Sequence, residues 1–90
     1  MDRKRIITNM LASLSTFRAR LEILDKNPTL ECLLRVMFDL ETLFEHTHPT
    51  PSGIAILAEK ITSLAQSLSA IGFQNESIQV AAMLSIVYFL

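Results

Sequence analysis

Cys32 and His46 are the pair of side chains in this sequence whose types suggest covalent catalysis. A cysteine thiolate attacks electrophiles, and a nearby histidine can remove the thiol proton. The two residues are fourteen positions apart, so on one helix, which rises about 1.5 Å per residue, they stand roughly 21 Å from each other. Free cysteine is also among the residue types most often buried as small apolar groups. We therefore expect Cys32 to belong to a core, and we expect no catalytic residue.

Glu41, Glu45 and His48 form the second candidate group, because their types and spacing suggest a metal site. Glu45 and His48 have the Glu-x-x-His spacing of di-iron helical bundles, and Glu41 lies one helical turn earlier. Those bundles need two such pairs and two further glutamates, whereas this sequence holds one pair. His48 also precedes Pro49, where a helix should already be ending. We expect no metal or other cofactor, while a metal shared across a dimer, which would double the ligands, stays an open alternative.

The run Arg3-Lys4-Arg5 is the basic cluster of the sequence, and cationic side chains of this kind bind phosphate backbones. The net charge of the whole chain is −1, so it has no long-range field that would gather nucleic acid. A small dimeric nucleic-acid-associated regulator is therefore an alternative, not the favoured function. The sequence also lacks a glycine-rich phosphate loop, zinc-ligand spacing and a catalytic triad, so we expect the protein not to be an enzyme.

The distribution of charge is the most informative property of the chain as a whole. Residues 61–90 contain one charged side chain, Glu76. Half of all residues are apolar and 19% are charged, against about 25% charged in typical soluble domains. A chain of 90 residues forms one domain, here 1–90, and buries only about 64% of the surface that its unfolded form exposes. We therefore expect a second copy or a partner chain to cover part of the apolar surface.

Four helical segments account for the apolar pattern. Pro28, Pro49, Pro51 and Gly72 divide the chain, and between them apolar residues recur at steps of three and four, which is the helical period. Joined by short turns, the expected helices are roughly 2–26, 28–46, 52–71 and 75–90. This pattern predicts the all-α class and a small antiparallel bundle of about four helices, completed by oligomerisation or a partner chain.

Local signals at the helix ends support these boundaries. Ser52 and Asn75 are expected to cap the third and fourth helices, with Glu76 favourable in the first turn of the fourth. Gly72 is the expected left-handed stop of the third helix. The segment 28–46 is apolar around most of its circumference, so we expect it to be the central helix.

The last segment is also apolar nearly all round, and we expect its surface to bury against another chain. The side chains expected at this interface are Val80, Met83, Leu84, Val87, Tyr88 and Leu90. On this interpretation the protein is a non-enzymatic protein–protein interaction module, such as a chaperone, antiactivator or adaptor subunit, that binds a partner helix through its last two helices. A structural homo-oligomer that uses the same surface is the alternative.

Two features of the chain are typical of a cytoplasmic protein. Its one cysteine, Cys32, has no partner for an internal disulfide, which fits a reducing compartment. The longest strongly apolar run, residues 80–90, is too short to cross a bilayer. We therefore expect a soluble, cytoplasmic protein without a transmembrane segment.

Overall fold

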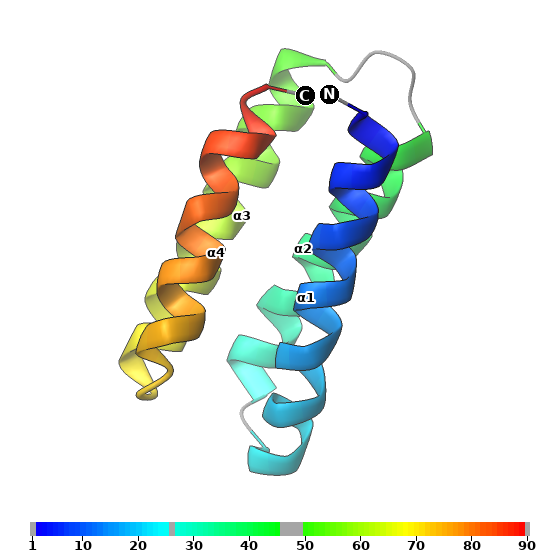
Figure 1. Cartoon of the computed structure of the whole chain (residues 1–90). Coiled ribbons are helices and arrows are strands. Elements are labelled where there is room, and N and C mark those ends of the chain that lie inside the picture. The colour runs from blue at the N-terminus through cyan, green and yellow to red at the C-terminus, as the bar shows by residue number, and fades with distance from the viewer. Residues whose placement is uncertain (1, 26, 46–49, 90) are drawn as a thin grey trace.

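Four helices make up the part of the chain that the structure describes, which is residues 2–25, 27–45 and 50–89. In this computed structural model the helices are α1 (Arg3–Leu24), α2 (Asn27–Glu45), α3 (Pro51–Ala70) and α4 (Gln74–Val87). Successive helices run in opposite directions along a body of 36 × 19 × 19 Å (Figure 1). No strand occurs in the described residues, so the predicted all-α bundle of about four helices is confirmed.

One apolar core runs along the bundle, and each helix contributes to it residues spaced by three and four positions. The buried apolar residues of this core are Ile7, Met10, Leu14, Phe17 and Leu21 of α1, Leu33, Val36, Leu40 and Leu43 of α2, Leu57, Ile61, Leu64, Ala65 and Leu68 of α3, and Val80, Met83 and Val87 of α4. Burying one large apolar side chain contributes about 1.5–3 kcal/mol relative to leaving it exposed. Packing of these residues, more than helix propensity, therefore holds the helices together.

The prediction that the second segment is the central helix is wrong. α2 packs against α1 and α3, and its remaining side faces solvent. Leu34 is exposed there, and Phe38 is exposed to 66%. In an up-and-down bundle each helix turns one side to the core and another to solvent, so no helix is central.

The N-terminal cap of α3 also differs from the prediction. Thr50, not Ser52, caps the helix: its Oγ1 accepts a hydrogen bond from the N–H of Gly53 at 3.0 Å. Pro51 takes the first helical position, where its lack of an N–H leaves no hydrogen bond unmade and its fixed φ suits the helix. The helix therefore starts before Ser52, which lies inside it.

α4 is shorter than predicted. It begins at Gln74, so Asn75 lies within the first turn and is not the cap. The side chain of Gln74 connects the start of α4 to the end of α3, since its Nε2 donates a hydrogen bond to the carbonyl oxygen of Ser69 at 3.1 Å. α4 ends at Val87, and Leu90, the expected helix end and an expected interface residue, lies outside the described residues.

The turn between α3 and α4 closes on a glycine in the left-handed region. Gly72 has a φ of +94°, which confirms the predicted stop. Its N–H donates to the carbonyl oxygen of Ser69 at 3.1 Å, and the N–H of Phe73 donates to that of Leu68 at 2.8 Å. These two bonds form a Schellman motif, which satisfies carbonyl groups left without partners at the end of a helix.

Each helix packs chiefly on its neighbour in the chain. α3 and α4 form the most extensive pair, followed by α1 with α2 and α2 with α3, whereas α1 and α4 meet at few points. Ser77 fixes α4 to α3, since its Oγ donates to the carbonyl oxygen of Ala65 at 2.7 Å. The Nζ of Lys60 on α3 donates to Oδ2 of Asp39 on α2 at 2.8 Å. The bundle is therefore closed between successive helices and open between α1 and α4.

Replacing Gly72 with alanine should destabilise the protein by about 1–2 kcal/mol, because a Cβ disfavours left-handed backbone. Beyond Gly72 and its two neighbours in the chain, no described atom lies within 4 Å of the place that this Cβ would take, so the loss reports backbone strain and not a clash. Gly72→Asn is the matched control and should lose less, because asparagine tolerates positive φ. Urea unfolding followed by circular dichroism measures both variants, and wild-type stability of Gly72→Ala would contradict this turn.

Candidate functional site

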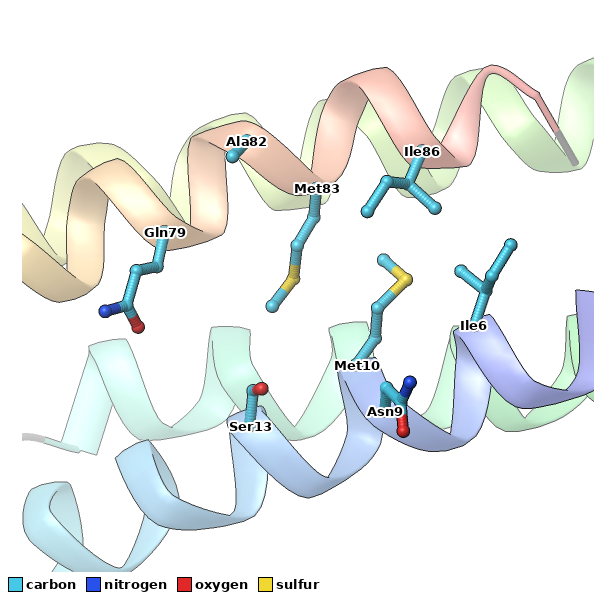
Figure 2. A pocket seen from close by; sticks show the side chains of 8 residues that line it. All are labelled: Ile6, Asn9, Met10, Ser13, Gln79, Ala82, Met83 and Ile86. Carbon is cyan, nitrogen blue, oxygen red and sulfur yellow. The ribbon is translucent and has the colours of Figure 1, made fainter. Parts of the chain in front are cut away.

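A groove separates α1 from α4 on the open side of the bundle, with a volume of about 510 Å³. The residues that line it are Ile6, Asn9, Met10 and Ser13 of α1 and Gln79, Ala82, Met83 and Ile86 of α4. Figure 2 shows the side chains of Met10 and Met83 extending into the space between the two helices, with Ile6 and Ile86 facing each other at one end. The two helices that lie farthest apart in the sequence therefore line one groove.

The groove is apolar at its floor and uncharged throughout. Met10 and Met83 are buried, while Asn9 and Gln79 are exposed and place their amides at the two rims. None of the lining residues carries an ionisable side chain. The groove thus offers apolar contact and hydrogen bonds, and it holds neither a general acid nor a base.

One ion pair joins the C-terminal half of α1 to the start of α4. Nη1 of Arg20 lies 3.2 Å from Oε2 of Glu76, and the Arg20 guanidinium lies 4.7 Å from the centre of the Phe73 ring. The Glu76 side chain is only 12% exposed, and its Oε2 has no aligned hydrogen bond from the described residues. Its charge is therefore balanced by the guanidinium and by the positive end of the α4 dipole. The single charge of residues 61–90 is neutralised within the chain.

The predicted interface residues of α4 do not form one exposed surface. Val80, Met83 and Val87 are buried in the core of the chain itself, because the period that aligns them also turns them toward the bundle. Val80 and Val87 are not available to a second chain, whereas Met83 also lines the floor of the groove. Leu84 is partly buried at the boundary between α3 and α4. Tyr88 is 66% exposed and stays a predicted contact residue.

Sequence analysis missed the α1 half of the groove and the most exposed apolar residues near the C-terminus. Ile78 is 68% exposed and Phe89 is 87% exposed. A helical period shows which residues of one helix share a side, but it does not show which helix lies opposite. The approach of Met10 to Met83 across the open side (Figure 2) therefore has no signal in the sequence.

Cys32 is a partly buried residue at the contact of α2 with α3. Its Sγ lies 3.6 Å from the carbonyl oxygen of Lys60. Burial raises the pKa of the Cys32 thiol, an effect that the positive charges of Lys60 and Arg35 reduce. A thiol with a raised pKa stays protonated at neutral pH and is a poor nucleophile. His46, the base suggested for it, lies outside the described residues.

The other candidate groups do not converge on a site within the described part of the chain. Glu41 and Glu45 are exposed on α2, and His48 lies outside the described residues. No three His, Cys, Asp or Glu side chains of residues 2–25, 27–45 and 50–89 are placed to hold a metal ion. In the basic cluster, the Nζ of Lys4 lies 5.5 Å from the centre of the Phe44 ring, so this lysine is directed toward α2.

Comparisons with models of protein families, with curated proteins and with solved structures find no match for this chain. None of the helices, as far as they are described, is long and apolar enough to span a membrane. A functional assignment therefore rests on the groove and on the outer surfaces of the helices.

Removing the ion pair between α1 and α4 should destabilise the bundle. Arg20→Ala leaves the carboxylate of Glu76 buried without its cation, and we expect a loss of about 1–3 kcal/mol. Arg18→Ala is the matched control, because it breaks the pair of Arg18 with Glu22, in which both side chains are about half exposed. That loss should stay below about 0.5 kcal/mol. Thermal unfolding of both variants is the measurement, and equal losses would show that the Glu76 carboxylate does not depend on Arg20.

The Cys32 thiol should react slowly with iodoacetamide in the folded protein. Because burial raises its pKa, the reactive thiolate fraction is smaller than for an exposed cysteine. The folded state also holds the thiol proton more tightly than the unfolded chain does, so its contribution to stability is complete below the ordinary thiol pKa and falls as the pH rises above it. Mass spectrometry of alkylation in folded and urea-unfolded protein tests this, and equal rates would refute it.

Proposed function

We propose that this protein is a non-enzymatic protein–protein interaction module that binds an amphipathic helix of another protein in the groove between α1 and α4. The observation that supports this proposal most directly is the uncharged opening with a methionine floor, on the side where the bundle's own helices leave it open. In this proposal the protein acts in the cytoplasm as a small chaperone, antiactivator or adaptor subunit, each of which works by holding a segment of its partner.

The dimensions of the groove suit a helix. From Ile6 to Ser13 the α1 wall covers eight residues, and the seven steps between them span roughly 10 Å at the helical rise, about two turns of a docked helix. The groove is open to solvent and is bordered by two antiparallel helices (Figure 1). A helix laid along it packs side chains between those of α1 and α4, as helices do within a bundle.

The lining of the groove suggests the chemistry of the bound helix. Met10 and Met83 have flexible, polarisable side chains that adapt to differently shaped apolar partners. The amides of Asn9 and Gln79 can both donate and accept hydrogen bonds, and so can contact polar side chains beside the partner's apolar side. Because no charged residue lines the groove, the fitting helix has apolar residues three, four and seven positions apart with uncharged neighbours.

Two alternative functions have weaker support. A structural homo-oligomer is favoured by a different observation, the absence of charge from residues 61–90 apart from Glu76. A nucleic-acid-associated regulator would depend on the cluster Arg3-Lys4-Arg5. The net charge of −1 and the placement of Lys4 against the Phe44 ring reduce what that cluster offers to a phosphate backbone.

A glutamate in the groove should weaken the binding of a helical peptide. Peptides selected from a displayed library of short amphipathic helices supply the probe, and the ε-methyl NMR signals of the methionines report where it binds. We expect the signals of Met10 and Met83 to shift, while that of Met37, which does not line the groove, stays in place. Ala82→Glu should weaken binding roughly tenfold or more, because a carboxylate covered by an apolar helix loses its hydration.

Ala81→Glu is the matched control for this experiment. Ala81 precedes Ala82 in α4 and is also exposed, but it does not line the groove. Its variant should bind the peptide as the wild type does. Selection that yields no binding peptide, or equal weakening by the two substitutions, would count against the groove as the binding site.

A further inference from the structure

A second shallow depression, which we call the furrow, lies between α3 and α4 on the other flank of α4. Its volume is about 490 Å³, and its lining includes Gln66 and Ala65 of α3 and Ala81 and Leu84 of α4. Consecutive helix residues point about 100° apart, so Ala82 lines the groove toward α1 while Ala81 lines the furrow toward α3. α4 therefore stands as a ridge between two depressions.

Three of the four polar side chains that line the furrow already have partners within the chain, the exception being the exposed Gln66. The hydroxyl of Thr62 donates to the carbonyl oxygen of Ala58 at 3.0 Å. The hydroxyl of Ser77 donates to the carbonyl oxygen of Ala65 at 2.7 Å, and that of Ser69 lies 3.2 Å from Oε1 of Gln74. Burying a polar group costs little free energy when the group keeps its hydrogen bond. Apart from the amide of Gln66, the furrow can therefore be covered by an apolar surface with little loss of hydrogen bonding.

Large apolar side chains stand at the two ends of the ridge, and small ones lie between them. Ile78 is exposed near the start of α4, and Tyr88 and Phe89 are exposed just after its end. Between them the outward positions are occupied by small exposed residues, among them Ala81 and Ser85. Small residues allow another helix to approach closely, while the large ones at the ends provide the apolar area.

The charge of this surface points to what covers it. Glu76 is the only charged residue of 61–90, and it is held by Arg20 of the same chain. A surface without charges cannot select a different partner by electrostatic complementarity. A second copy of the chain brings an equally uncharged surface, so the two faces meet without the repulsion that a charged face suffers when it meets itself.

We propose that a second copy of this chain docks on the furrow and ridge of α3 and α4, forming a two-fold symmetric dimer. In an antiparallel pairing the small residues near Ala81 meet at the axis, and Ile78 of each copy lies near the C-terminal end of α4 in the other. A stable interface removes roughly 800 Å² from each partner, about one-seventh of the 5589 Å² surface of the chain. Outward side chains of residues 61–89 supply that area in this dimer, and the exposed Glu59, one turn before Thr62 on α3, stays outside it. The groove toward α1 stays free for a different protein.

Light scattering coupled to size exclusion, over a tenfold range of concentration, tests this dimer. The wild type should have twice the 10.1 kDa mass of one chain. Ala81→Glu should shift the mass to that of one chain, because it places two like charges at the axis without cations nearby. Ala82→Glu should remain dimeric, and so should Ala19→Glu, which makes the same change at an exposed position of α1. Circular dichroism checks that each variant is folded.

Three outcomes would overturn the proposal. The first is a wild type with the mass of one chain at every concentration. The second is an Ala81→Glu variant that is folded and still dimeric. The third is dissociation by Ala82→Glu alone, which would seat the second copy in the groove toward α1. If Ala81→Glu does not fold, Gln66→Glu takes its place, since it is nearly isosteric and exposed on the α3 side of the furrow; it too must yield single chains.

The proposals for the dimer and for the groove can be refuted independently. A dimer that selects no peptide would refute the groove and leave the furrow intact. A monomeric chain whose Met10 and Met83 signals shift with a peptide would refute the dimer and support the groove. The adjacent substitutions Ala81→Glu and Ala82→Glu thus report on different surfaces of one helix.

Discussion

α4 has apolar residues on every side, and a bundle of four helices can bury only one side of it. The other features of this molecule follow from that mismatch. Val80 faces the core, Ala82 and Ala81 stand on the two flanks, and Ile78 is left in solvent. The other three helices put charged residues on their outward sides, whereas α4 has Glu76 alone, and that carboxylate is turned toward α1.

Helix number and class were predictable because apolar spacing and strong helix breakers are local signals. Gly72 is a clear case, since few other residues adopt its φ without strain. The cap at Thr50 was misassigned to Ser52 because two hydroxyl residues flank one proline, and only the position of that proline in the first turn decides between them. The interface prediction failed for Val80 for a different reason. An all-round apolar helix reveals that something covers it, but which side the chain covers itself depends on long-range packing.

The two depressions beside α4 differ in the state of their polar groups. In the furrow, the hydroxyls of Thr62 and Ser77 already donate to carbonyl groups of the same chain. At the groove rims, the side chains of Asn9 and Gln79 make no hydrogen bond with the described residues. A surface on which most polar groups are satisfied, as in the furrow apart from Gln66, accepts an apolar partner of the right shape. A surface with unpaired amides favours a partner that supplies matching groups, because an unmatched amide is costly to bury.

The order in which the helices pack has a consequence for chain entropy. α1 with α2, α2 with α3 and α3 with α4 each join segments that are close in sequence, and the contact of α1 with α4 is the sparse one. Closing a long loop restricts the chain more than closing a short one, although the difference grows slowly with length. Forming the contact between α1 and α4 thus costs the most chain entropy in the bundle, and this contact provides the fewest interactions. We therefore expect local opening of the fold to begin on this side.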